Sequence, residues 1–463
     1  MAPQLSKFID ASCKEFSHPW VDSCTRATTG LGLNTLQESL RIYSTVYIVA
    51  FLMRGKVPSK GDVKKTVLGI LQSTAFLSWN GFAYSFFVCF LRRVLGHFNI
   101  LTVSFFPAFL ASFTAILIER PSRRTLLSLY VSNIASETLF RMGVSRGYWH
   151  PVPFAETCIF AISMAALLYY YRSKTSKSDP VYKILRLVVG KYEDAEYLEN
   201  PSCEIQDSSE TVNRCRNDSV VNSPARKDIN IFMKSLEAYG NLLARLKVKS
   251  KRSCCPHPFS CIHYILKGGV QVFGYAFGGQ LVVNLVFGVA KLIKKPTLLK
   301  SMIVKKGNLY LPIFIGGFAA LYRLVSCSLR RTIQKDSPYF AFPAALIGGL
   351  TFTTYKSNTI SLYFMWKALQ LLWYDLAEKG IVPEVKWFAI FLYCFNTAVV
   401  FHAAIVEPQN LRSSYWKFLH NVSGGRIAAM SRTPIDKFGL NTSKHLADVL
   451  KATNTTDKMI FHF

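Results

Sequence analysis

The sequence predicts an all-α, polytopic membrane protein with two repeated bundles of about four transmembrane helices each. Three observations predict this fold. Apolar residues gather in blocks of about twenty, the length that crosses roughly 30 Å of hydrocarbon as a helix. Charged residues make up only 18% of the 463 residues and concentrate between these blocks. Similar motifs also recur in the same order in the two halves of the chain.

The chain divides into five predicted segments. Residues 1–35 form a cysteine-containing N-terminal segment, and residues 36–171 form the first transmembrane repeat. Residues 172–257 are a polar linker, in which weak apolar periodicity is typical of partial disorder. Residues 258–406 form the second repeat, and residues 407–463 form a polar C-terminal tail.

Each repeat contains several candidate spans. They are 36–53, 67–91, 100–118 and 154–171 in the first repeat, and 261–289, 309–329, 340–354, 359–376 and 387–406 in the second. Residues 122–148 are mixed in polarity and are expected to form an amphipathic or partly buried helix. The block at 359–376 contains Lys367 and Asp375 and is expected either to cross or to lie at the interface. These two segments leave the span count, and therefore the relative orientation of the repeats, open.

Short matching motifs predict an internal duplication. Cys89-Phe-Leu-Arg-Arg93 matches Cys327-Ser-Leu-Arg-Arg331, and Phe106-Pro-Ala-Phe-Leu110 matches Phe342-Pro-Ala-Ala-Leu346. Their common order and nearly constant separation, near 235 residues, are the signature of a repeated unit.

The net charge of +28 points to lipid rather than to nucleic acid. The lysines and arginines fall mainly in short connections between apolar blocks, where they contact lipid phosphate and set topology. The sequence has no helix-turn-helix, zinc-finger or RNA-binding signature, so nucleic acid is not expected as a partner.

Small residues recur at four-residue spacing within the predicted spans. The candidate helix-packing positions are Gly274, Gly278, Gly316, Ala344 and Gly348. Small side chains let helix backbones approach closely in a membrane. This packing is expected within the chain or, alternatively, against a partner protein.

A group of cysteine and histidine residues precedes each repeat. The groups are Cys13, His18 and Cys24, and then Cys254, Cys255, His257 and Cys261. Such residues could hold a tetrahedral zinc ion, pair as disulfides in an oxidising space, carry acyl chains, or stay as reduced thiols. Adjacent Cys254 and Cys255 fit no standard zinc spacing, and no cofactor is predicted.

Three ionisable residues near the spans are candidates for a polar groove, because such residues are costly in lipid. Glu137 and Arg141 are four residues apart and could pair on one helix face. Lys356 lies beside a span of the second repeat. The groove would accept a lipid headgroup or an ion, and the alternative is ion pairing and snorkelling at helix ends.

The chain has no Walker loop, nucleophile elbow, HExxH motif or dinucleotide fingerprint. We therefore predict that it is not an enzyme.

Several long motifs resemble the transmembrane protein 135 family. They are Leu36-Gln-Glu-Ser-Leu-Arg-Ile-Tyr43, Ile118-Glu-Arg-Pro-Ser-Arg-Arg124, Ser136-Glu-Thr-Leu-Phe-Arg-Met-Gly-Val-Ser-Arg-Gly147 and Leu411-Arg-Ser-Ser-Tyr-Trp-Lys-Phe-Leu419. The spacing of Cys13, His18 and Cys24 resembles the start of that family's cysteine-rich N-terminal region.

The resemblance implies a multi-pass protein of mitochondrial and peroxisomal membranes. It also implies a role in mitochondrial fission and fusion balance, peroxisome organisation and lipid metabolism, with dynamin-related fission machinery as a partner. The family is in turn distantly similar to the channel-forming subunits of the mitochondrial inner-membrane translocase. The alternative function is a lipid or small-solute transporter or channel. The resemblance supplies no catalytic residues.

Overall fold

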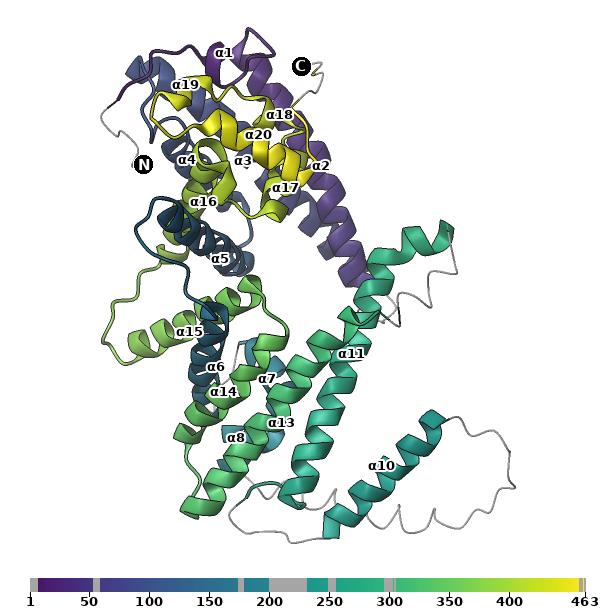
Figure 1. The fold of residues 1–463 in the computed structure, drawn as a ribbon. Coiled ribbons are helices and arrows are strands. Elements are labelled where there is room, and N and C mark those ends of the chain that lie inside the picture. Colours follow the sequence, from purple (N-terminus) through teal and green to yellow (C-terminus); the bar gives the residue numbers. More distant parts are fainter. Residues whose placement is uncertain are drawn as a thin grey trace. The chain divides into compact units, whose positions relative to one another are not determined.

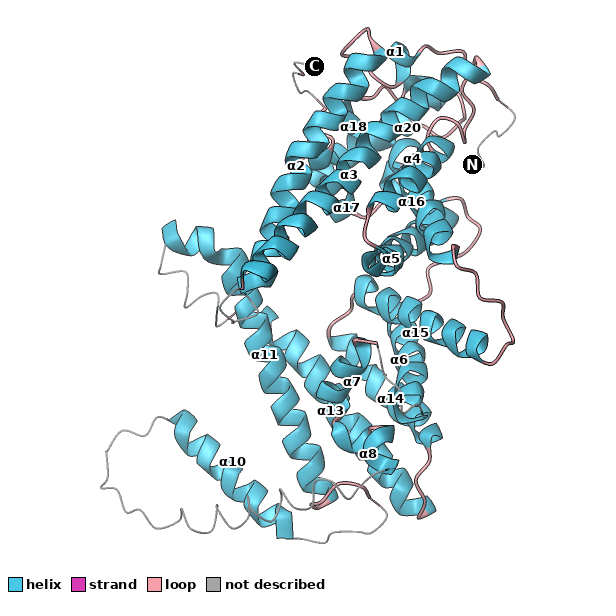
Figure 2. Cartoon of the chain, turned by 180° about the vertical axis from the view of Figure 1, so that it is seen from behind, coloured by secondary structure: helices cyan, strands magenta, loops and turns pink. Residues whose placement is uncertain are grey.

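The computed structural model describes residues 7–52, 59–173, 179–199, 231–248, 255–294, 303, 305–457 and 461. Within these residues the regular secondary structure is helical, and the one isolated β-bridge joins Ile9 to Phe98. The prediction of an all-α protein is therefore confirmed. Figures 1 and 2 show the helices from opposite sides.

The chain packs into two compact units whose boundaries differ from those of the predicted segments. Unit 1 joins Met1–Val152 to Leu376–Phe463, and unit 2 is Pro153–Asp375. The last apolar helix of the predicted first repeat thus belongs to unit 2, and that of the predicted second repeat belongs to unit 1. The duplication itself stays a prediction.

Unit 1 combines helices from the two ends of the chain. They are α1 (Cys13–Phe16), α2 (Cys24–Leu52), α3 (Lys60–Leu95), α4 (Phe105–Ile118), α5 (Pro121–Ser145), α16 (Phe388–Val406), α17 (Ser413–Val422), α18 (Arg426–Ala429), α19 (Thr433–Asp436) and α20 (Thr442–Thr453), with the 3₁₀ turn η5 (Pro408–Asn410). Helix α2 packs on α3, α3 packs on α4, and α16 packs on both α4 and α5.

Unit 2 is built from the middle of the chain. It contains α6 (Ala155–Ser173), α7 (Val181–Val189), η1 (Lys191–Glu193), α8 (Ala195–Glu199), α10 (Ile231–Val248), α11 (Cys261–Lys294), α13 (Gly307–Ile333), η3 (Pro338–Phe340), α14 (Ala341–Gly349), η4 (Leu350–Thr354) and most of α15 (Asn358–Glu378). Helix α11 packs on α13, α13 packs on α14, and α14 packs on α6. This order of neighbours matches the order α2, α3, α4 and α16 in unit 1.

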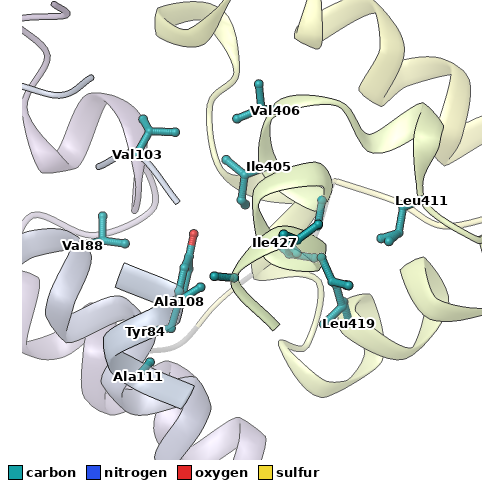
Figure 3. Close-up of a cluster of buried hydrophobic side chains, with 14 of the residues drawn as sticks. Tyr84, Val88, Val103, Ala108, Ala111, Ile405, Val406, Leu411, Leu419 and Ile427 are labelled. Atoms are coloured by element: carbon teal, nitrogen blue, oxygen red, sulfur yellow. The ribbon is translucent and has the colours of Figure 1, made fainter. Parts of the chain in front are cut away.

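Small residues on α4 allow the close packing at the centre of unit 1. Ala108, Ala111 and Ala115 are buried there, and Tyr84 of α3 is buried beside them. Figure 3 shows this cluster together with Ile405 at the end of α16. Small side chains bring helix backbones together where apolarity does not distinguish helix from lipid.

Three described helices are long and apolar enough to cross a membrane, namely α3, α13 and α16. They coincide with the predicted spans at 67–91, 309–329 and 387–406. Helix α4 has 14 residues and is therefore about 21 Å long, which is short of the roughly 30 Å of hydrocarbon. Helix α14 has only 9 residues before η4 begins.

Local hydrogen bonds mark the start of α4 and the end of α14. Asn99 Oδ1 accepts from the backbone of Leu101 at 3.0 Å and of Thr102 at 2.8 Å, forming a turn before α4 begins. The Thr351 hydroxyl donates to the carbonyl of Gly348 at 2.7 Å where α14 tightens into a 3₁₀ helix. Polar side chains thus replace backbone partners inside the predicted spans at 100–118 and 340–354.

Helix α5 is the partly buried helix that was expected at 122–148, and its buried side combines apolar with polar residues. Its buried face carries polar residues such as Ser132, Asn133 and Glu137. Its exposed face carries large apolar residues, including Leu126 and Tyr130. This arrangement suits a lipid environment, where the apolar side of a helix faces outward and its polar side faces the protein.

The predicted polar linker at 172–257 contains helical structure at both ends, with α7, η1 and α8 before residue 200 and α10 after residue 230. Its centre, residues 200–230, lies outside the described residues. Glu193, at the end of η1, is completely buried.

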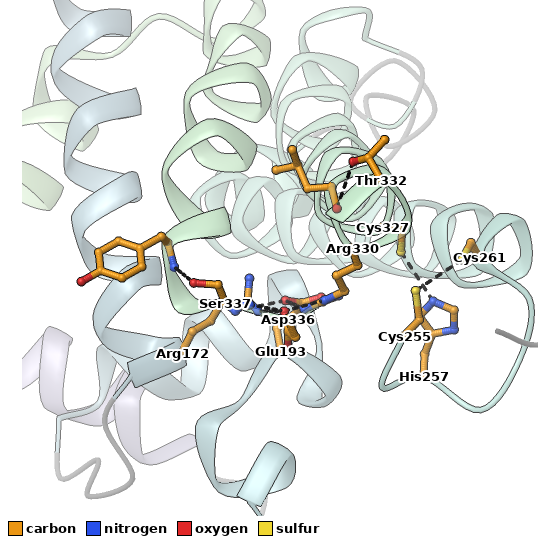
Figure 4. A network of polar contacts seen from close by, with 12 residues as sticks. Arg172, Glu193, Cys255, His257, Cys261, Cys327, Arg330, Thr332, Asp336 and Ser337 are labelled. Carbon is orange, nitrogen blue, oxygen red and sulfur yellow. Dashed lines mark hydrogen bonds and ion pairs between the residues drawn. The ribbon is translucent and has the colours of Figure 1, made fainter. Parts of the chain in front are cut away.

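A buried ion-pair network connects Glu193 of this segment to α6 and α13 of unit 2 (Figure 4). Arg330 of α13 donates to both carboxylate oxygens of Glu193, at 2.8 and 2.7 Å. Its Nε donates to Asp336 at 2.8 Å, and Arg172 of α6 pairs with Asp336 as well. The bidentate geometry is the strong form of this interaction.

We predict that Glu193→Gln destabilises unit 2, because it removes the buried one of the two carboxylates that pair with Arg330 and Arg172. Removing one partner of a buried ion pair costs about 3–5 kcal/mol. Denaturation of the full chain in detergent measures the free energy of unfolding. Glu196→Gln is the matched control, since residue 196 is exposed, and equal stability of the two variants would contradict the prediction.

Candidate functional site

Four residues that are distant in sequence meet in unit 1. Cys13 begins α1, His18 follows it in a loop, Cys24 begins α2, and Cys89 lies on α3. Their three sulfur atoms and one imidazole nitrogen lie within 4.8 Å of one another. We call these residues cluster 1.

Backbone pairing brings cluster 1 together at one end of α3. Ile9 and Phe98 exchange backbone hydrogen bonds of 2.8 and 2.9 Å, which fixes the N-terminal segment beside the end of that helix. Arg92 Nε donates to the carbonyl of Ala11 at 2.7 Å. A capping box between Ser12 and Glu15 then starts α1 with Cys13 as its first residue.

Unit 2 contains a second group with the same residue types, which we call cluster 2. Cys255 and His257 lie in the loop before α11, Cys261 begins α11, and Cys327 lies on α13. Their ligand atoms also lie within 4.8 Å of one another. The sulfurs of Cys255 and Cys261 are 3.7 Å apart, and Cys327 Sγ is 3.5 Å from His257 Nε2 (Figure 4).

The backbone orients both histidines in the same way. Nδ1 of His18 is 2.9 Å from the carbonyl of Val21, and Nδ1 of His257 is 2.6 Å from that of Phe259. A carbonyl oxygen only accepts, so Nδ1 donates and Nε2 faces the thiols. Nε2 of His18 is buried without a hydrogen-bond partner among the described residues.

Each cluster favours the thiolate form of one of its cysteines. A hydrogen bond from Cys89, helped by His18 and Cys24, outweighs burial and lowers the pKa of Cys13 to about 5. A hydrogen bond from Cys327, helped by His257, likewise lowers the pKa of Cys255 to about 4. For His18, burial lowers the pKa, but the neighbouring Cys13 sulfur and the Val21 carbonyl raise it further, to about 9.

The sequence analysis identified three residues of each cluster, and the structure brings each set of three together. The fourth predicted residue of the second group, Cys254, lies outside the described residues. Cys89 and Cys327 were missed as cluster members. Their signal was present, because both begin the matching motifs of the predicted repeat, Cys-x-Leu-Arg-Arg.

The predicted groove residues divide between the two units. In unit 1, buried Glu137 accepts from Arg141 on its own helix and from Arg412, whose Nε lies 2.9 Å from Glu137 Oε2. In unit 2, the ammonium of Lys356 lies 4.4 Å from the ring centre of Phe154. Glu137 is thus a structural ion-pair partner, and sequence analysis did not identify Arg412.

The predicted helix-packing positions differ in how closely neighbouring atoms approach them. Ala344 is fully buried, and a Cβ at Gly348 would lie 3.3 Å from the Phe318 ring. At Gly316 it would lie 2.8 Å from Phe273 of α11, so glycine is required for that approach. At Gly274 and Gly278 a Cβ would meet no described atom within 4 Å, because another face of α11 meets α13.

Unit 2 also contains a basic pocket of about 540 Å³, which includes His257 of cluster 2 in its wall. Its cationic lining residues are Lys183, Arg186, Lys191, Lys267 and Arg323. Among the described residues, no aspartate or glutamate lines it. A pocket of this size and charge accepts an anionic headgroup or metabolite.

Arg323 is the deepest cation of this pocket. It is 4% exposed, donates from Nη2 to the carbonyl of Val188 at 3.1 Å, and makes no ion pair with a described residue. Its buried Nε has no hydrogen-bond partner there. A Cβ at Gly268 would lie 2.3 Å from the guanidinium, so glycine makes the room that Arg323 occupies.

The corresponding cavity of unit 1 has only about 70 Å³. It lies between α2, α3 and the helices that follow α16, and Ser85 lines it four residues before Cys89. Arg323 stands four residues before Cys327. Of these two cavities, the large basic one lies in unit 2.

The fold and its sites define a class of protein: a multi-pass helical membrane protein with a Cys₃His cluster in each of two units. Residues 10–144 match the family model of the N-terminal cysteine-rich region of Transmembrane protein 135, a stretch that holds all of cluster 1. This match supports membership of the chain in the transmembrane protein 135 family, and such membership fits an organelle membrane protein. No solved structure matches the chain.

We predict that the two arginines bound to Glu137 contribute unequally to the free energy of unfolding. The Arg412 side chain is 19% exposed and the Arg141 side chain is 41% exposed. Arg412→Met should lower the free energy of unfolding by about 1–3 kcal/mol, because it leaves one buried oxygen of Glu137 without its partner while Arg141 still binds the other. Arg141→Met should cost no more than about 1 kcal/mol, as for exposed pairs.

Denaturation of both variants in detergent measures this difference. If both arginine variants are as stable as the unaltered chain, the ion pairs of Glu137 do not stabilise the fold. Glu137 is then again a candidate residue of the polar groove.

Proposed function

We propose that this chain is a multi-pass protein of mitochondrial and peroxisomal membranes that regulates mitochondrial fission and fusion balance. We propose that it also acts in peroxisome organisation and lipid metabolism, without being an enzyme. The observation that carries this proposal is the family match over residues 10–144. Three membrane-length apolar helices and the exposed large apolar residues of α5 support the membrane part.

The proposal includes dynamin-related fission machinery as a partner. A soluble partner needs a polar segment outside the lipid, and the longest such segment in the sequence is the predicted linker at 172–257. Its first part is tied into unit 2 through Glu193 and Arg330. The partner is therefore best sought in residues 201–230, which can be altered without removing these contacts.

We predict that deleting residues 201–230 leaves the protein in its membranes but stops it from restoring mitochondrial shape in cells that lack it. Fluorescence imaging measures location and mitochondrial length together. A variant with the same residues in shuffled order controls for linker length. Full restoration by the deletion variant would refute the proposed docking segment. A longer deletion from 193 to 252 would be uninformative, because it removes Glu193 and α10.

A second candidate function, transport of a lipid or small solute, is favoured by the basic pocket of unit 2. The pocket combines cationic side chains with aromatic ones such as Tyr264 and Tyr275. Anionic groups bind such sites through charge and hydrogen bonds, while rings cover their apolar parts. Arg323 is the best probe, since its buried Nε has no hydrogen-bond partner among the described residues.

We predict that, if the chain transports, Arg323→Met abolishes flux through purified protein in liposomes. Fluorescent phospholipid flipping and small-ion leakage are followed together, so that a lipid substrate and an ion are distinguished. Arg331→Met is the matched control, because residue 331 lies on the same helix and is exposed. Flux no greater than in empty liposomes would refute transport and leave the regulatory function.

A further inference from the structure

We propose that each unit binds one structural Zn²⁺ ion, in unit 1 through cluster 1 and in unit 2 through cluster 2. Each site would be a closed Cys₃His set. Three sulfurs and one imidazole nitrogen form a complete tetrahedral shell, as in structural zinc sites, with no position left for water or substrate. The proposal is independent of the proposed cellular function.

The distances in cluster 2 match those around a tetrahedral zinc ion. With Zn–S near 2.3 Å and Zn–N near 2.05 Å, tetrahedral geometry places two sulfurs about 3.8 Å apart and a sulfur and nitrogen about 3.5 Å apart. The observed separations are 3.7 Å between the sulfurs of Cys255 and Cys261 and 3.5 Å between Cys327 Sγ and His257 Nε2. The other ligand-atom pairs lie within 4.8 Å of one another.

The histidines are held as zinc ligands are held. Zinc-bound imidazoles donate their second ring N–H to a backbone carbonyl or carboxylate, which fixes the ring and the free lone pair. His18 and His257 both do so through Nδ1. The buried Nε2 of His18 then points at three sulfurs and has no hydrogen-bond partner among the described residues.

The position of each cluster gives the ion a structural task. Two ligands come from α1 and the loop after it in unit 1, and from the loop before α11 in unit 2. In each unit the first residue of a long helix supplies the third ligand, and the next long helix supplies the fourth. The ion would therefore join α2 to α3, and α11 to α13, at their ends. Two groups with the same composition at matching places in the predicted repeat are difficult to explain as chance.

The competing states of the cysteines fit the geometry less well. A disulfide uses two sulfurs and leaves a third thiol and an imidazole without a role in each cluster. Acylation requires access, yet Cys255 is 7% and Cys327 is 4% exposed. Soft thiolate donors with one imidazole in a tetrahedral set select zinc among the common divalent ions. Binding replaces the thiol protons, up to three per site, which pass to solvent.

Metal analysis of the full chain, purified in detergent without chelator, tests the proposal. We expect two zinc ions per chain, one in Cys89→Ser, and none in the double variant Cys89→Ser, Cys327→Ser. The matched control is Cys394→Ser, since Cys394 is a fully buried cysteine on α16 outside both clusters, and it should keep both ions. Unaltered protein without stoichiometric zinc, or loss of zinc in the control, would overturn the proposal.

A second measurement on the unaltered chain does not depend on variants that fold. Exchange of the bound metal for Co²⁺ should give the visible bands of a tetrahedral ion and the near-ultraviolet bands of thiolate ligation, at two equivalents. Mass spectrometry without reductant should find the cluster cysteines unlinked. Octahedral cobalt spectra, or cluster cysteines joined as disulfides in metal-free protein, would refute the zinc sites.

Discussion

The close contact of α16 with α4 is the interaction on which unit 1 depends. Residues 105–118 and 388–406 are at opposite ends of the sequence, yet the alanines of α4 are buried where α16 packs. The contact is supported by a buried hydrogen bond of 2.6 Å from Asn396 to Ser132 of α5. The helices beyond α16 pack on α1, α2 and η5 and on one another. In unit 2, α6 and α14 make the corresponding contact.

Buried charge follows from the same constraint. Helices with apolar outer faces must place their polar residues inward, and each inward charge then requires a partner. Glu137 with Arg412 serves unit 1, and Glu193 with Arg330 serves unit 2. Arg323 is one exception, since among the described residues it has carbonyl and aromatic neighbours but no carboxylate. The basic pocket forms around this exception.

Several features of the fold could be predicted because they depend on local composition. The apolar blocks predicted the helices, and Lys and Arg between them predicted the connections. The unit boundaries could not be predicted, since the hydropathy of α6 or α16 does not say which neighbour it packs against. The short helices α4 and α14 also escaped, because single polar residues such as Asn99 and Thr351 end or tighten them. Spacing alone identified three residues of each cluster, whereas Cys89 and Cys327 join through tertiary packing.

Unit 1 combines helices from the two ends of the chain, and this has a consequence for the biogenesis of the protein. Helices α2 to α5 are synthesised long before α16, so unit 1 cannot close until nearly the whole chain has left the ribosome. During that interval the polar face of α5, with Glu137, has neither Arg412 nor α16 beside it. Contacts this distant in sequence form slowly, and incompletely packed intermediates are exposed to wrong partners. Insertion of this protein should therefore depend strongly on membrane chaperones that shield α5 until the chain is complete.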